Sequence, residues 1–116
     1  MYKFGTIVLI PFPFTDLSST KLRPALIISR TSGKEEDVIV AFITTKTEHR
    51  KRLSDFSLKS SDAHFQDTGL KMNSVVRFDK IATLNKKLIL GELGYVHPAL
   101  LRKMKSSFGA AFGFNA

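Results

Sequence analysis

Eight consecutive residues decide the fold of this chain: Val38-Ile39-Val40-Ala41-Phe42-Ile43-Thr44-Thr45. Successive side chains of a strand point to opposite faces, and here both faces are apolar until the two closing threonines. An exposed strand would alternate apolar and polar residues instead. We therefore predict that residues 38–45 form a central strand, with neighbouring strands along both edges and cover on both faces.

Five further strand-like runs lie on either side of this central stretch. They cover residues 6–10, 24–29, 56–58, 74–84 and 88–93. Proline donates no hydrogen bond to a ladder, so we expect the first run to stop before Pro11 and the second to begin at Pro24. Arg23 then lies at the junction between a polar loop and a strand, and the proline that follows it holds its backbone extended.

Only the C-terminal end has the periodicity of a helix. Apolar residues recur there at spacings of three and four, with cations opposite them. A proline suits the first helical position, so we predict a helix from Pro98 to Phe112, with His97 as its N-terminal cap. Six short strands and one amphipathic helix predict a mainly β fold, a small barrel or twisted sheet whose open face the helix covers. With 116 residues we expect one domain, residues 1–116.

The composition narrows the classes of function. The chain has 18 Lys and Arg against 10 Asp and Glu, a formal net charge of +8, which favours a polyanionic partner, nucleic acid first. It has no cysteine, which excludes a disulfide scaffold, a thiolate nucleophile and a Cys-ligated metal site. No apolar run approaches the ~20 residues of a membrane-spanning helix, and no secretory leader is visible. We therefore expect a cytoplasmic protein with no membrane partner.

Motifs for metal or nucleotide chemistry are missing from the sequence. The three histidines, His49, His64 and His97, form no pair at ligand spacing, and there is neither a phosphate-cradling glycine loop nor a nucleophile elbow. We therefore expect no metal ion and no cofactor.

Arg77 and Asp79 are the most informative polar pair. On an extended strand they share one face, while Val76 and Phe78 share the other, so a cation and a carboxylate stand side by side. Taken alone, such a pair is an ordinary surface ion pair that contributes at most about 1 kcal/mol. The segment from Lys46 to Arg52 adds four cations against one acid; alone it is a solvated loop, but beside Arg23 and Arg77 it would extend a track for phosphates.

Four segments of the chain match a known pattern in their order and spacing. They are Ile7-Val8-Leu9-Ile10-Pro11-Phe12, Leu22-Arg23-Pro24-Ala25-Leu26-Ile27-Ile28, Val40-Ala41-Phe42-Ile43-Thr44-Thr45 and Ser74-Val75-Val76-Arg77-Phe78-Asp79-Lys80-Ile81-Ala82-Thr83-Leu84. Together they resemble the PemK/MazF family, the endoribonuclease toxins of type II toxin–antitoxin systems. The resemblance implies an SH3-like barrel with a C-terminal helix, a homodimer, a single-stranded RNA substrate and a cognate antitoxin, with operator DNA bound only together with the antitoxin.

The resemblance also implies a catalytic set, namely Arg23, Thr44, Arg77 and Asp79. Metal-independent cleavage would use the 2′-hydroxyl of the RNA as nucleophile and leave a 2′,3′-cyclic phosphate and a 5′-hydroxyl. That reaction needs a proton acceptor, a group that assists the departing 5′-oxygen and positive charge on the phosphate. We assign these roles to Asp79, Arg77 and Arg23, with Thr44 bonding a phosphate oxygen. Contacts to RNA are expected from Asp16, Ser18, Lys21, Thr45, Lys46, Arg50, Lys51, Arg52 and Lys71.

The loop from Thr15 to Leu22 departs from the family pattern. Many relatives carry a loop with Gly and with Gln or Glu there, and some a His, so one candidate acid–base group is missing here. A barrel that binds nucleic acid without cleaving it therefore stays open as an alternative. A protein-directed toxin of the gyrase type is the other; those relatives rely on a tryptophan near the C-terminus, and this chain has none.

Overall fold

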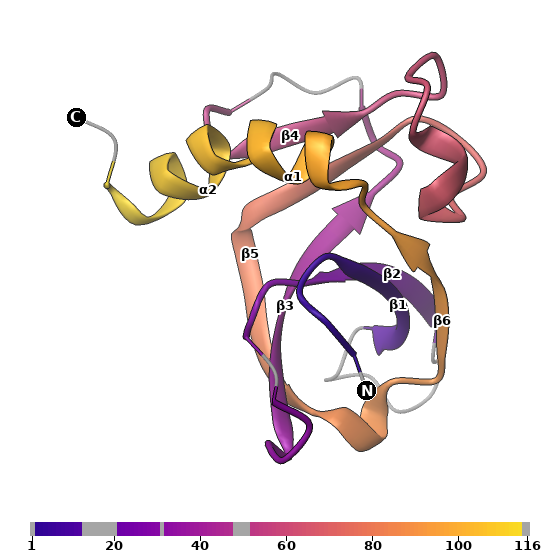
Figure 1. Cartoon of the computed structure of the whole chain (residues 1–116), viewed down its shortest axis with the longest axis vertical. Helices are drawn as coiled ribbons and strands as arrows, with labels where there is room; N and C mark the ends of the chain where they lie inside the picture. Colours follow the sequence, from indigo (N-terminus) through magenta and orange to yellow (C-terminus); the bar gives the residue numbers. More distant parts are fainter. Residues whose placement is uncertain (1, 13–20, 31, 48–51, 115–116) are drawn as a thin grey trace.

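The computed structural model describes residues 2–12, 21–30, 32–47 and 52–114. Within these residues, six antiparallel strands form one sheet in the order β4-β5-β3-β2-β1-β6. The strands are β1 (Thr6–Phe12), β2 (Lys21–Ile27), β3 (Asp37–Thr44), β4 (Asp55–Leu58), β5 (Ser74–Asn85) and β6 (Gly91–Tyr95). The sheet curls into a half-barrel, and the two C-terminal helical segments lie beside β4 at one end of it (Figure 1). The mainly β prediction is confirmed.

Strand β3 is the central strand that its apolar pattern predicts. It pairs with β2 on one edge and with β5 on the other. Its side chains alternate between two hydrophobic clusters: Val38 and Val40 lie in one, Ala41 and Ile43 in the other. Both faces of β3 are therefore covered, which agrees with the lack of polar residues between Asp37 and Thr44.

The two clusters occupy the two faces of the sheet. One includes Ile10, Ile27 and Leu84. The other lies beneath the C-terminal segments, where Leu100 and Met104 join it from the helical side. Among the described residues, no helix is long and apolar enough to cross a membrane.

Two prolines lie inside strands, where the sequence predicts strand ends. Strand β1 continues through Pro11, and β2 begins three residues before Pro24. Pairing of β1 with β6 ends at Leu9, and pairing of β2 with β3 begins only at Ala25. Among the described residues each proline therefore has a strand neighbour on one side alone, the edge position in which a residue without an N–H group is tolerated. Arg23 consequently lies within β2, not at a junction.

The C-terminal helix has the predicted ends but is interrupted by a turn at Met104. It consists of α1 (Pro98–Lys103) and α2 (Lys105–Phe112), and the Met104 N–H donates to the carbonyls of both Leu100 and Leu101. The predicted cap is confirmed, because Nδ1 of His97 accepts a hydrogen bond from the N–H of Ala99 at 3.0 Å.

Two short 3₁₀ helices lie where the sequence predicts other structure. The first, η1 (Phe65–Thr68), lies between two of the predicted strands and buries the Phe65 side chain. It packs closely on β6, since a Cβ added at Gly94 would lie 2.2 Å from the Asp67 carbonyl oxygen. The second, η2 (Lys86–Leu88), is capped by the Asn85 side chain and delays the last strand to residue 91.

A long bend in β5 separates the two halves of the sheet. Ala41 of β3 lies opposite Ile81, but the next residue, Phe42, lies opposite Arg77. Residues 78–80 of β5 thus have no residue of β3 opposite them, and the strand turns sharply there (Figure 1). The bend places Arg77 and Asp79 at the corner where β3, β4 and β5 meet.

Candidate functional site

A pocket of about 390 Å³ opens at this corner. Its walls come from β2, β3, β4, β5 and the segment that follows β3. The residues that line it are Arg23, Pro24, Phe42, Ile43, Thr44, Thr45, Lys46, Thr47, Arg52, Asp55, Val75, Arg77 and Lys80. Five of these thirteen residues are Lys or Arg and one is Asp, so the pocket is suited to an anion such as a phosphate.

Arg23 and Thr44 come together because of strand register. Ala25 lies opposite Phe42, so continuing this antiparallel register by two residues brings Arg23 beside Thr44. The Arg23 side chain is exposed, and the Thr44 hydroxyl oxygen accepts a hydrogen bond from the N–H of Lys46 at 3.1 Å. A guanidinium and a hydroxyl thus line one wall of the pocket.

Arg77 and Asp79 form a two-point ion pair at the opposite wall. Nε of Arg77 donates to one carboxylate oxygen of Asp79 at 2.9 Å, and a terminal nitrogen donates to the other at 2.8 Å. This bond lowers the pKa of Asp79 below its ordinary value and raises the pKa of Arg77 above its own. Both groups are therefore charged at neutral pH. They lie side by side, as the alternation of residues along β5 predicts.

Asp55 is a pocket residue that the sequence analysis did not identify. It is the first residue of β4 and lies opposite Arg77 in the strand register. Its side chain is only 6% exposed, and Oδ1 lies 3.6 Å from Nε of Arg77. Only the pairing of β4 with β5 brings Asp55 to this place, and no pattern in the sequence gives that pairing.

Four charged side chains form one alternating network. Besides the contacts of Arg77, Nε of Arg52 lies 3.8 Å from Asp79, and a terminal nitrogen of Arg52 lies 3.7 Å from Oδ2 of Asp55. The N–H of Arg52 also donates to that oxygen at 3.2 Å. Each arginine of the network therefore lies between two carboxylates. The two positive charges of the network balance its two negative charges.

The predicted site residues fall into three groups. Arg23, Thr44 and Arg77 line the pocket, together with three of the predicted RNA contacts, Thr45, Lys46 and Arg52; Asp79 joins them through Arg77 and Arg52. Lys21 and Lys71 are exposed and do not line the pocket. The remaining four predicted contacts, Asp16, Ser18, Arg50 and Lys51, lie outside the described residues.

Thr47 and Lys80 line the pocket, although neither was among the predicted site residues. Lys80 follows Asp79 directly on β5, so the bend of that strand is what brings it to the wall. Among the residues that the structure describes, no group of three or more His, Asp or Glu side chains is arranged to hold a metal ion.

The curled six-stranded sheet, its C-terminal helix and the basic pocket define a class of small barrel-like proteins with an anion-binding corner. The profile of one such family, described as PemK-like, MazF-like toxin of type II toxin-antitoxin system, matches residues 3–112. The chain belongs to this family, which confirms the resemblance seen in the sequence.

Solved structures of the same fold include several from mycobacteria. An endoribonuclease from a mycobacterial species in complex with its cognate antitoxin is 24% identical, with a TM-score of 0.76, over 100% of this chain and 99% of that one. A second mycobacterial endoribonuclease is 25% identical, with a TM-score of 0.72, over 99% and 94%. The Mycobacterium tuberculosis toxin MazF-mt6 is 23% identical, with a TM-score of 0.72, over 96% and 99%. A search of curated sequences gives no match.

Proposed function

We propose that this protein is an endoribonuclease toxin that cleaves single-stranded RNA in the pocket at the bend of β5. One observation carries the proposal: Arg23, Thr44 and Arg77 line the same pocket, with Asp79 bonded to Arg77. Membership of a toxin family and the fold shared with mycobacterial endoribonucleases support it. The wild-type protein is expected to cleave RNA without a metal ion.

The pocket groups suit cleavage by the 2′-hydroxyl of the RNA itself. In this reaction the 2′-oxygen bonds to phosphorus, its proton passes to Asp79, and the bond from phosphorus to the 5′-oxygen breaks. The departing 5′-oxygen takes a proton from water and becomes the 5′-hydroxyl. Arg23 holds the phosphate, Thr44 bonds one of its oxygens, and Arg77 stabilises the departing 5′-oxygen. Because its ion pair raises an already high pKa, Arg77 acts as a fixed positive charge and does not itself donate a proton.

The partners follow from the family. We propose a homodimer whose RNA groove is covered by a cognate antitoxin, in the cytoplasm, with operator DNA bound only in the presence of the antitoxin. Two of the solved neighbours, one mycobacterial and one from Deinococcus radiodurans, are complexes of a toxin with its antitoxin. Light scattering of the purified protein tests the dimer, and a single particle of monomer mass would contradict it.

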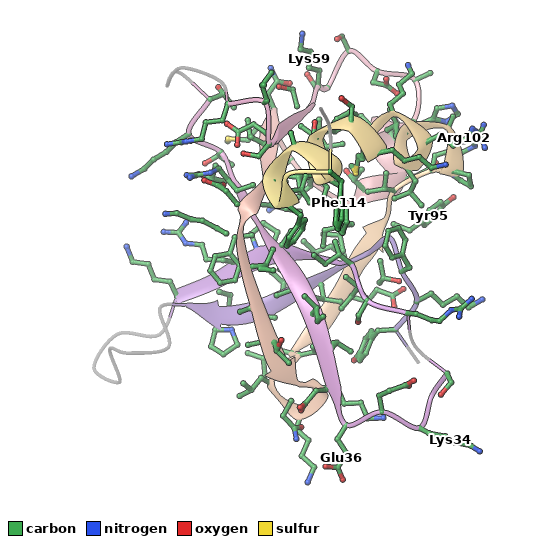
Figure 2. The ribbon with its side chains drawn as sticks, turned by 90° about the vertical axis from the view of Figure 1, so that its left-hand side faces the viewer. Lys34, Glu36, Lys59, Tyr95, Arg102 and Phe114 are labelled. Atoms are coloured by element: carbon green, nitrogen blue, oxygen red, sulfur yellow. The ribbon has the colours of Figure 1, made fainter. Side chains whose placement is uncertain are left out.

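The test of the reaction is digestion of single-stranded RNA in EDTA. Wild-type protein should give fragments with 2′,3′-cyclic phosphate and 5′-hydroxyl ends, and Asp79→Asn and Arg23→Ala should give no detectable fragments in the same digestion time. Lys34→Ala is the matched control for lost positive charge, since Lys34 is exposed and does not line the pocket. It lies in the turn before β3, at the far end of the molecule from α1 (Figure 2). Cutting by both site variants at the wild-type rate would overturn the assignment.

One observation favours a second candidate, a barrel that binds nucleic acid without cleaving it. Both carboxylate oxygens of Asp79 are occupied by Arg77, so the proposed proton acceptor has its best lone pairs in use. The same digestion separates the two functions. A silent binder would bind RNA with an affinity that falls as salt rises, and no new ends would form.

A further inference from the structure

Asp55 carries a charge in a place where a charge is costly. Its side chain is 6% exposed, and Oδ1 is buried without any hydrogen bond within the described part of the chain. A buried carboxylate oxygen without a partner loses the bonds that water would give it, and natural proteins leave few such atoms. The proposed mechanism assigns roles to four other residues and none to Asp55.

Oδ1 of Asp55 lies close to one hydrogen-bond donor, Nε of Arg77, which already bonds Asp79. Nε of Arg77 bonds Asp79 at 2.9 Å and lies 3.6 Å from Oδ1 of Asp55. A shift of less than about 1 Å would bring that N–H to hydrogen-bond distance of Asp55. Asp79 would then have its oxygen free, as a proton acceptor requires.

The rest of Asp55 is held in place. The N–H of Arg52 donates to Oδ2 at 3.2 Å, and the hydroxyl of Ser107 on α2 donates to the Asp55 carbonyl at 3.1 Å. The backbone also pairs with β5 directly opposite Arg77. The carboxylate is therefore a fixed acceptor, while Asp79, with about a third of its side chain exposed, has room to move.

We propose that Asp55 is a positioning residue that takes over Arg77 when Asp79 accepts the proton of the 2′-hydroxyl. The bond from Nε of Arg77 to Asp79 breaks, a bond from the same N–H to Oδ1 of Asp55 forms, and Arg77 keeps its charge and its place beside the phosphate. The role of Asp55 in catalysis rests on the proposed ribonuclease function. The second acceptor itself is a property of the folded chain and can be tested without RNA.

The first experiment is a crystal structure of the Asp79→Ala variant, which removes the primary partner of Arg77. The guanidinium should settle on Asp55, with the distance from Nε to Oδ1 shortened from 3.6 Å to about 2.9 Å. An Arg77 side chain turned into solvent, with Oδ1 of Asp55 still unpartnered, overturns the proposal whether or not the protein cleaves RNA.

The second experiment measures cleavage by Asp55 variants at saturating RNA. The kcat should fall in the order wild type, Asp55→Asn, Asp55→Ala, by on the order of 10- to 100-fold for alanine, while the Kd for uncleavable 2′-O-methyl RNA stays within about twofold. Asn keeps an acceptor oxygen without the charge, which explains the intermediate rate. Weakened RNA binding with unchanged kcat would contradict a positioning role.

The matched control is Ser107→Ala, which removes a bond to the Asp55 backbone but leaves the carboxylate intact. It should lower the Tm with little change in kcat. Equal losses of kcat and Tm in Ser107→Ala and Asp55→Asn would mean that Asp55 only holds β4 in place. If wild-type protein cleaves no RNA, the proposed function fails, and the Asp79→Ala structure still decides the question of Asp55.

Discussion

The two walls of the pocket hold their arginines in opposite ways. On the wall formed by β4 and β5, Arg77 is 17% exposed and lies between the carboxylates of Asp55 and Asp79. On the β2 wall, Arg23 is exposed, and among the described residues no carboxylate pairs with its side chain. The first arginine is fixed before any ligand arrives, whereas the second is available to whatever enters.

This difference separates two tasks that one pocket must perform. A positive charge that is already held in place, such as that of Arg77, does not have to move during the reaction. It can therefore stabilise the negative charge that develops beside it. An exposed guanidinium that has no carboxylate partner among the described residues contributes to capture, because a bound phosphate balances its charge. We therefore expect changes on the Arg77 wall to affect rate and stability, and changes on the Arg23 wall to affect binding.

The largest effect should come from Arg77→Ala. It removes the group that stabilises the departing oxygen, and it leaves Asp55 buried with less compensation, so cleavage should vanish and stability should fall by about 3–5 kcal/mol. Urea unfolding measures the second loss. Adding Asp55→Asn to Arg77→Ala should restore part of it, and a double variant no more stable than the single one would refute the role of buried charge.

Asp79→Asn should have a large effect on rate alone. Losing the proton acceptor is expected to slow cleavage by about 10²- to 10⁴-fold. Stability should change by at most about 1 kcal/mol, because the carboxylate is partly exposed. Single-turnover cleavage together with urea unfolding separates the two effects, and a wild-type rate would remove Asp79 from the mechanism.

Arg23→Ala should change how RNA binding depends on salt. If its guanidinium neutralises one phosphate of single-stranded RNA, the slope of log K against log salt should become shallower by about 0.7. Fluorescence titrations of 2′-O-methyl RNA at several salt concentrations measure this slope. Lys34→Ala, an equal charge change on an exposed residue, should leave it unchanged. An unaltered slope in Arg23→Ala would contradict the assignment of RNA binding to the Arg23 wall.

The smallest effect concerns pH. The hydrogen bond from Arg77 lowers the pKa of Asp79 in the folded protein, so the stabilisation from this pair is complete above the unfolded carboxyl pKa of about 3.9. It is lost as the pH falls through the lower folded value. The stability difference between wild type and Asp79→Asn, at most about 1 kcal/mol at pH 7, should therefore disappear in strong acid. A difference that grows on acidification would contradict the ion pair.

The sequence predicts those parts of the fold and site that local patterns control. The alternation of Val76, Arg77, Phe78 and Asp79 places the ion pair on one face, and the apolar residues of β3 predict its central position. The cap at His97 follows from the proline after it. Each of these features depends on neighbours within a few residues along the chain.

The features that the sequence does not predict depend on strand pairing. The two prolines are tolerated within β1 and β2 only because each has a neighbouring strand on one side. In the sequence Asp55 is one acidic residue before a short strand, and only its position opposite Arg77 marks it as a site residue. The helix η1 packs closely against Gly94 of β6, and this contact between distant parts of the chain cannot be predicted from a local sequence pattern.

The bend of β5 also bears on how this pocket can be altered. Three residues of β5 span a single step of β3, so the side chains of Asp79 and Lys80 are exposed and lie outside the regular ladder. A library randomised at Lys80, which lines the pocket and has no assigned catalytic role, should therefore sample new substrate preferences without shifting the register of either sheet half. The corner is a natural site for directed evolution of this barrel.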